Sequence, residues 1–177
     1  MLDTSVLVSF FADPEKEPER HRECIELLRR AHTFHVATVA MPEVLGHFPV
    51  VKRRDVGRRL SSTFFIEPFD VGVVDVASAL HAQALRIYKA QKAPRQGRQC
   101  VKLDCYILAT ALAKRMDAVC SFDGDYGPLL DWARAQGCAP QTFRCLEPAA
   151  LVPDPPLPLR EAGQFAALAE DLEAEAD

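Results

Sequence analysis

The first thirteen residues, "MLDTSVLVSFFAD" (residues 1–13), place a carboxylate and two hydroxyls immediately before an apolar run. The acid is Asp3, the hydroxyls are Thr4 and Ser5, and the run covers residues 6–11. That run is short enough to fit either a strand or a helix. An acid in this position is either the N-cap of a helix or a group with a chemical role. Which of the two applies depends on the other polar residues of the chain.

The bulk composition indicates one compact domain. The chain has 177 residues, of which 49% are apolar, and this is ample for a core of that size. No apolar run is long enough to cross a membrane, and Asp3 stands where the basic start of an export signal would lie. None of the six cysteines forms a CxxC pair, so we expect free thiols in a reducing cytoplasm rather than disulfides or a zinc site.

The charge is unevenly distributed, which suggests a domain followed by a tail. Residues 151–177 contain seven acids and one arginine, a net charge of −6 within a total of −4. Five prolines fall between residues 148 and 158, a composition typical of linkers. We therefore expect a folded domain over residues 1–147 and, over 148–177, a Pro-rich linker with an acidic, helical tail. The body carries +2, so its sign does not exclude a polyanionic partner.

Short apolar runs alternate with amphipathic segments along the body. Hydrophobic spacing predicts helices from Pro18 to about residue 31, and over 76–88, 103–116 and 126–137, with a further helix capped by Thr38. Strand character is found at 34–37, 64–71, 117–122 and 139–146, and residues 92–102 read as a polar, basic loop. This alternation predicts an α/β fold: a three-layer α/β/α arrangement with a mainly parallel central sheet flanked by helices.

Acidic residues recur where these strands end or the following helices start. Asp3 follows a very short strand at the N-terminus, and Glu43 lies in an early helical turn. Asp104 is expected to begin a helix. Asp123 and Asp125 follow the strand at 117–122. In parallel sheets the ligand site lies beyond the carboxyl ends of the strands. Residues that are far apart in sequence could therefore converge at one rim.

Several carboxylates in one cleft would repel each other, by about 1 to 4 kcal/mol for a pair at about 4 Å, unless cations were recruited. Oxygen ligands suit Mg²⁺ or Mn²⁺, which also bind phosphate oxygens and activate water. The pattern favours a nuclease. Each acid also has an ordinary structural alternative: Asp3 and Asp104 as helix caps, Glu43 as a first-turn acid, and Asp123 as a turn residue.

Four blocks of sequence, in order, resemble the PIN domain, and within it the toxin ribonucleases of VapBC-type toxin–antitoxin systems. They are "LDTSVLV" at residue 2, "MPEVLG" around Glu43, "KLDCYILATAL" around Asp104 and "VCSFDGDY" around Asp123. The resemblance implies a metal-dependent endoribonuclease that uses Mg²⁺ or Mn²⁺. It implies catalytic, metal-binding acids at Asp3, Glu43, Asp104 and Asp123, an additional metal-binding acid at Asp125, and supporting hydroxyls at Thr4, Ser5 and Ser121. In that family several apolar residues precede the first acid, whereas here only two do.

The resemblance also implies partners: RNA, a cognate antitoxin protein and a second copy in a homodimer. Basic residues in the loop before Asp104 are suited to RNA phosphates, namely Arg95, Arg98 and Lys102. A second basic stretch, residues 52–59, could equally be a solvated surface. Two other functions remain open from the residues, a PIN-like module that binds RNA or protein without cutting, and a metal-dependent phosphatase.

Overall fold

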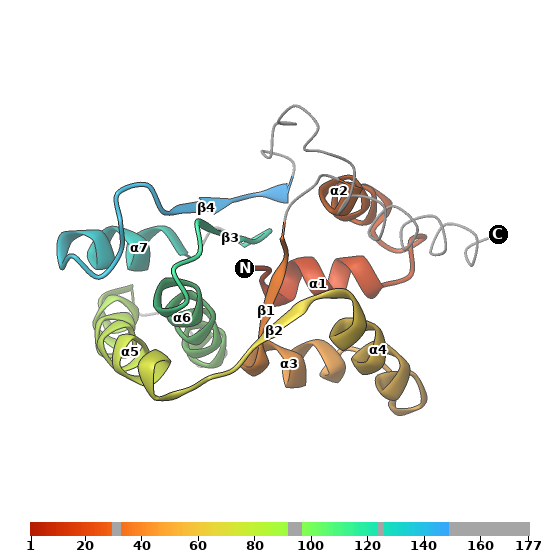
Figure 1. The fold of residues 1–177 in the computed structure, drawn as a ribbon, viewed down its shortest axis with the longest axis horizontal. Helices are drawn as coiled ribbons and strands as arrows, with labels where there is room; N and C mark the ends of the chain where they lie inside the picture. Colours follow the sequence, from red (N-terminus) through yellow and green to blue (C-terminus); the bar gives the residue numbers. More distant parts are fainter. Residues whose placement is uncertain (30–32, 92–96, 124–125, 149–177) are drawn as a thin grey trace.

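The structure, a computed structural model, describes residues 1–29, 33–91, 97–123 and 126–148, and the side chains of residues 87–101 are also outside the described part. In chain order the elements are α1 (Thr4–Phe11), α2 (Pro18–Arg29), β1 (His35–Ala37), the 3₁₀ turn η1 (Thr38–Ala40), α3 (Met41–Gly46), α4 (Val50–Thr63), β2 (Phe65–Glu67), α5 (Val71–Gln91), α6 (Gly97–Ala113), β3 (Ala118–Cys120), α7 (Tyr126–Ala135) and β4 (Arg144–Leu146). Figure 1 shows this order.

The strands form two parallel pairs that the N-terminus joins into one sheet. β1 pairs with β2, and β3 pairs with β4. Leu2 forms parallel bridges to Val36 of β1 and to Cys120 of β3, so the order across the sheet is β2, β1, Leu2, β3, β4. The Leu2 amide donates to the His35 carbonyl at 2.8 Å, and the Asp3 amide donates to the Cys120 carbonyl at 2.9 Å. The centre of the sheet is therefore only one bridged residue long.

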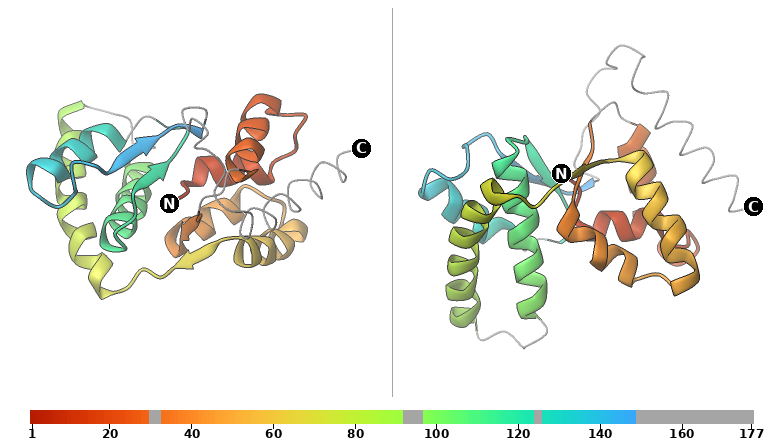
Figure 2. Two further views of the ribbon diagram at one scale, coloured as in Figure 1. Left: turned by 45° about the horizontal axis from the view of Figure 1, so that its top comes forward. Right: turned by 60° about the horizontal axis from the view of Figure 1, so that its bottom comes forward.

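Helices flank this short sheet, as the alternating pattern predicted. In Figures 1 and 2, α1 to α4 lie to one side of the strands and α5 to α7 to the other. The α5 and α6 helices run side by side as an antiparallel pair. The α/β/α prediction is confirmed, although each paired strand has only three residues and helices dominate the domain.

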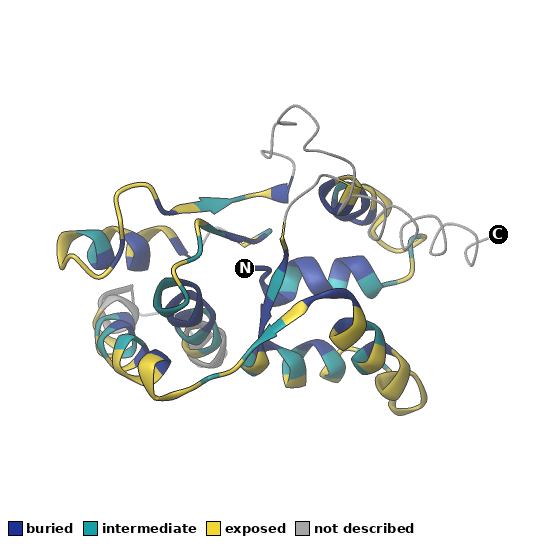
Figure 3. Ribbon diagram, viewed as in Figure 1, coloured by how far each residue is buried: buried dark blue, intermediate teal, exposed yellow. Residues whose placement is uncertain are grey.

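The core gathers where the helices meet the sheet (Figure 3). Leu7 of α1, Val36 of β1 and Leu108 of α6 have no exposed surface, and they belong to one continuous apolar cluster. In α1, the buried residues Val6, Leu7 and Phe10 have helical spacing, which settles the ambiguity of the first apolar run. Burial of this apolar stripe holds a helix of only eight residues against the sheet.

Two local predictions were wrong. The predicted loop over 92–102 is shorter, because α6 begins at Gly97, and Asp104 therefore lies inside α6 rather than at its start. Thr38 does not cap a helix by its side chain, since its hydroxyl donates to the Glu67 carbonyl at 2.7 Å and a 3₁₀ turn precedes α3. Leu, Lys and Gln are good helix formers, so helix can extend back to the glycine that follows the proline-containing segment.

The end of the domain is partly described. After α7 the chain turns at Gly137, whose φ of 70° is the left-handed conformation that follows many helices. The predicted tail over 148–177 lies outside the described residues from residue 149 onward. Within the described part, no helix is both long and apolar enough to span a bilayer.

Candidate functional site

Asp3 directly follows Leu2, the central residue of the sheet, and directly precedes α1. Its backbone is extended, with φ −83° and ψ 162°, and its side chain accepts the Ser5 amide at 3.4 Å as the N-cap of α1. Only 2% of Asp3 is exposed. A buried carboxylate is costly unless polar groups surround it. Its neighbours therefore show what this position is built for.

Three hydroxyls donate to the Asp3 carboxylate. Oδ2 accepts from Ser5 Oγ at 2.7 Å and from Ser121 Oγ at 2.8 Å. Oδ1 accepts from the hydroxyl of Tyr126 at 2.8 Å. A carboxylate oxygen offers about two acceptor sites. Oδ2 is therefore saturated, whereas Oδ1 keeps one acceptor site that these hydroxyls do not use.

The same hydroxyls fasten the segment after β3 to the start of α1. Ser5 Oγ accepts the amide of Phe122 at 3.1 Å and lies 3.3 Å from Ser121 Oγ. Ser121 Oγ in turn accepts the amide of Asp123 at 2.9 Å. The supporting-hydroxyl prediction thus places Ser5 and Ser121 beside Asp3, and this network holds the backbone of Asp123 close to it.

Tyr126 was not among the predicted site residues. Burial raises its pKa well above the usual value of 10.0, and the negative charges of Asp3 and Asp104 raise it further. The phenol therefore stays protonated and acts as a donor at any physiological pH. Asp104, on α6, thus acts on this phenol through its charge, whereas Asp3 bonds to it directly. The only signal in the sequence was an aromatic residue three positions after Asp123.

Glu43 reaches the site from α3. Its Oε2 accepts a hydrogen bond from Thr4 Oγ1 at 2.8 Å, and the side chain is half-buried. Thr4 follows Asp3 directly, so this contact links the second predicted acid to the start of α1. Residues 39 positions apart in the chain are joined here, as expected for a rim at the ends of parallel strands.

The structure shows fewer contacts for the remaining predicted site residues. Asp123 follows β3 and is exposed, and Lys102 is exposed on α6. Arg98 also lies in α6, but its side chain is outside the described part, as are Arg95 and Asp125 entirely. Among the residues that the structure describes, no three carboxylate, imidazole or thiol side chains lie close enough to hold a metal ion jointly. In the described part, hydroxyl groups connect Asp3 and Glu43 to the start of α1, and Ser121 joins Asp3 to the backbone of Asp123.

The donor chemistry nevertheless fits a hard divalent cation. The predicted metal ligands of the described rim all carry oxygen donors, the type that Mg²⁺ prefers, and Mg²⁺ keeps several waters while using only one or two protein carboxylates. Among the described residues, the Tyr126 hydroxyl is the one donor seen at Asp3 Oδ1, which is compatible with such a ligand role. Since Mg²⁺ sites rarely need all-protein cages, a rim without three clustered acids is not in conflict with one.

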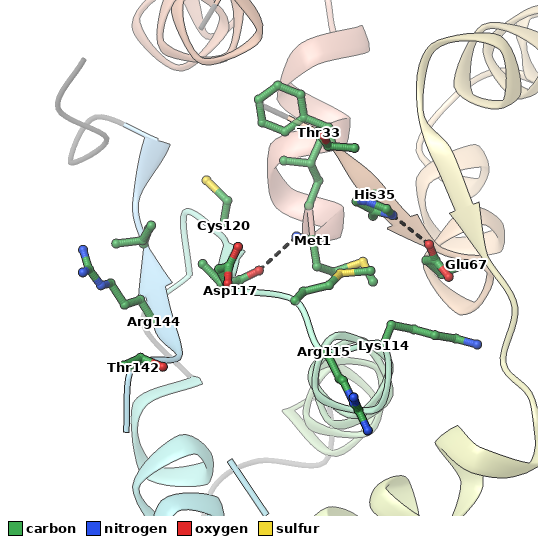
Figure 4. Close-up of a pocket in the computed structure, with 15 residues that line it drawn as sticks. Met1, Thr33, His35, Glu67, Lys114, Arg115, Asp117, Cys120, Thr142 and Arg144 are labelled. Carbon is green, nitrogen blue, oxygen red and sulfur yellow. Dashed lines mark hydrogen bonds and ion pairs between the residues drawn. The ribbon is translucent and has the colours of Figure 1, made fainter. Parts of the chain in front are cut away.

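A separate cavity of about 790 Å³ lies beside Met1 and Leu2 (Figure 4). It is lined by Met1 and by residues of β1, β3 and β4, and none of the four predicted catalytic acids is among the lining residues. The Met1 ammonium donates to the Ala118 carbonyl at 2.9 Å, and His35 Nδ1 lies 2.7 Å from Glu67 Oε1. This cavity is distinct from the acidic rim.

The fold and this site define a parallel α/β domain with a buried, hydroxyl-bound carboxylate at a strand end. Comparison with known families is more specific: the PIN domain model matches residues 1–127, and the chain belongs to the PIN domain family. PIN domains are generally nucleases that depend on divalent metal ions, usually Mg²⁺. A comparison with curated proteins gave no significant match.

Proposed function

We propose that this protein is an endoribonuclease that uses Mg²⁺ or Mn²⁺ to hydrolyse RNA phosphodiester bonds, and that it is the toxin of a VapBC-type toxin–antitoxin pair. Membership of the PIN family supports the nuclease class. The carrying observation is the buried Asp3 carboxylate at the strand edge, held by Ser5, Ser121 and Tyr126. Three hydroxyl donors on one buried acid fix its orientation far more tightly than a helix cap requires.

The residues proposed to hold the metal are Asp3, Glu43, Asp104 and Asp123, with Asp125 as an additional ligand. A bound divalent cation supplies charge neutralisation for a phosphodiester and lowers the pKa of water. The role of the chain's own hydroxyls is orientation: Ser5 and Ser121 fix Oδ2 of Asp3, and Tyr126 fixes Oδ1. Thr4 does the same for Glu43 through its bond to Oε2. This second layer of donors keeps negatively charged groups in place despite their mutual repulsion.

The test compares carboxylate-to-amide variants on RNA. Asp3→Asn and Asp104→Asn remove one charge each with little change in shape, and we expect cleavage of single-stranded RNA in Mg²⁺ to fall at least about a hundredfold. Asp75→Asn is the matched control, because Asp75 is an exposed acid on α5, and it should cleave at the wild-type rate. EDTA should abolish cleavage by the wild type, with recovery on adding Mg²⁺ or Mn²⁺. Wild-type rates for Asp3→Asn would refute the site.

The toxin role is tested in cells with the same variants. Expression of the wild-type chain should arrest bacterial growth, and Asp3→Asn should relieve the arrest at equal protein level. Growth arrest that persists with Asp3→Asn would separate toxicity from RNA cleavage. Co-expression of a protein encoded beside this chain should also restore growth if that neighbour is the antitoxin. We propose a homodimer as the working form, which sedimentation of the purified chain can check.

A second function, an RNA-binding module that does not cut, is favoured by one observation. Within the described ranges the acids do not form a three-ligand metal group. Such a module would bind RNA in a salt-sensitive manner with no divalent-dependent turnover. The cleavage assay therefore decides between the two, since RNA binding without product in Mg²⁺ or Mn²⁺ would leave only the module.

A further inference from the structure

An acidic site repels a polyanion such as RNA unless positive charge on the protein lies nearby. Arg20 of α2 supplies such a charge beside the site. The guanidinium carbon of Arg20 lies 5.0 Å from the centre of the Phe122 ring, a cation–π arrangement. Phe122 is the residue between Ser121 and Asp123, and its amide donates to Ser5 Oγ. Arg20 thus contacts the segment that the Asp3 network holds in place.

The geometry of Arg20 suits a ligand contact better than a purely structural role. Its side chain is 51% exposed, so the guanidinium keeps access to solvent while one face rests on the ring. Its ion pair with Glu17 is long, at 3.5 Å, and joins residues one helical turn apart. An exposed pair of this kind contributes little and exchanges readily for another anion. The planar guanidinium is left able to bind a phosphate through two parallel hydrogen bonds.

We propose that Arg20, seated on Phe122, forms a binding site for single-stranded RNA beside the acidic rim, where it contacts a backbone phosphate next to the bond to be cut. The proposal rests on the nuclease function above and names an RNA-contacting residue for it. Phe122 restricts the guanidinium to one side of the 121–123 segment. RNA recognition by stacked arginine planes and phosphate contacts is common where bases are unpaired.

The neighbouring residue Arg22 provides a matched control. It lies on the same helix two positions further on and is exposed, so its side chain leaves α2 in a different direction. Replacing either arginine removes the same charge from the same element. The two variants, Arg20→Ala and Arg22→Ala, should therefore differ in RNA affinity only if Arg20 belongs to a specific binding site.

The experiment measures binding of a labelled single-stranded RNA to the full chain in EDTA, where no cleavage occurs, over a range of salt concentrations. Arg20→Ala should weaken binding about tenfold, as for the loss of one charge-assisted hydrogen bond. The slope of log affinity against log salt should fall by about 0.7, the value for one phosphate contact on a single strand. Arg22→Ala should bind as the wild type does.

Two further variants test the geometry. Arg20→Lys keeps the charge but loses the planar fork, so it should restore only part of the affinity and the full salt slope. Glu17→Gln removes the competing carboxylate and should tighten binding by up to about fivefold, an effect that Arg20→Ala should abolish in the double variant. Thermal unfolding of each variant verifies that the fold is intact.

The outcomes separate this site from the nuclease proposal. Equal losses in Arg20→Ala and Arg22→Ala, an unchanged affinity in Arg20→Ala, or no RNA binding by the wild type would each overturn the Arg20 site. RNA binding that depends on Arg20 in a chain that never cleaves in Mg²⁺ or Mn²⁺ would support the site and overturn the nuclease function alone.

Discussion

At the scale of single residues, the hydrogen-bond partners of Asp3 say more about its role than its being an aspartate does. An aspartate that only caps α1 would need one amide partner, yet Asp3 receives three hydroxyl donors, and two of them come from distant parts of the chain. Tyr126 completes the set, and its raised pKa keeps the donor proton in place near two negative charges. Orientation of a buried carboxylate is thus distributed over side chains more than a hundred positions apart.

Tyr126→Phe tests this arrangement. The change removes one hydroxyl and leaves Oδ1 of Asp3 without its donor, so the free energy of unfolding should fall by about 1.5 to 3 kcal/mol. Tyr106→Phe is the control, because this half-buried tyrosine packs against Phe69 by its ring and should lose less than about 0.5 kcal/mol. Urea denaturation measures both. Equal losses in the two variants would mean that the Tyr126 hydroxyl has no special role.

At the scale of elements, two glycines show how backbone conformation constrains sequence. Gly57 lies inside α4, where a Cβ would contact the Leu45 side chain at an ordinary distance of 3.7 Å. Gly137 follows α7 with φ of 70°, a conformation that side chains with a Cβ adopt at a cost. The two glycines therefore have opposite roles.

Alanine at these glycines should shift stability in opposite directions. Gly137→Ala should lower the free energy of unfolding by about 1 to 2 kcal/mol, because the left-handed backbone is retained. Gly57→Ala should raise it by about 0.4 to 1 kcal/mol, because alanine restricts the unfolded chain and favours helix. Thermal or urea denaturation decides the signs. A stabilising Gly137→Ala would show that the turn after α7 can adopt another conformation.

At the scale of the whole molecule, the start of the chain is structurally central. Met1 and Leu2 lie between the two strand pairs, and the Met1 ammonium is bound inside the sheet. Burial lowers the pKa of this amine from 8.0 to about 6, an effect that the nearby carboxylates of Asp117 and Glu67 only partly offset. A charged group in this position opposes folding whenever it is protonated.

Stability should therefore rise with pH through this window. Because the folded pKa lies below the unfolded one, the penalty is fully present below about pH 6 and disappears above about pH 8. Two pKa units correspond to roughly 2.7 kcal/mol. The measurement compares unfolding at pH 5.5 and 8.5 for a chain with a free Met1 amine and for the same chain acetylated there, so that histidine titrations cancel. Identical pH profiles for the two forms would contradict the burial argument.

Much of the architecture was predictable because it depends on local patterns. Helical spacing of apolar residues located α2 and α7, and short β-branched and aromatic runs located β1 and β2. The start of α6 was misplaced because no cap residue marks it in the sequence, and the polar first turn of a helix resembles a polar loop. Spacing could likewise not reveal Tyr126, whose partner lies 123 positions away.

The sequence by itself determined the alternation of elements, the position of Asp123 after a strand and the hydroxyls after Asp3, because each follows from neighbouring residues. Only the tertiary structure decided that a single residue, Leu2, joins two strand pairs, and that a phenol and two serines share one carboxylate. It also placed Arg20 over Phe122. The physical reason is that hydrogen bonds and desolvation act between groups that are close in space, whereas sequence patterns record only those close along the chain.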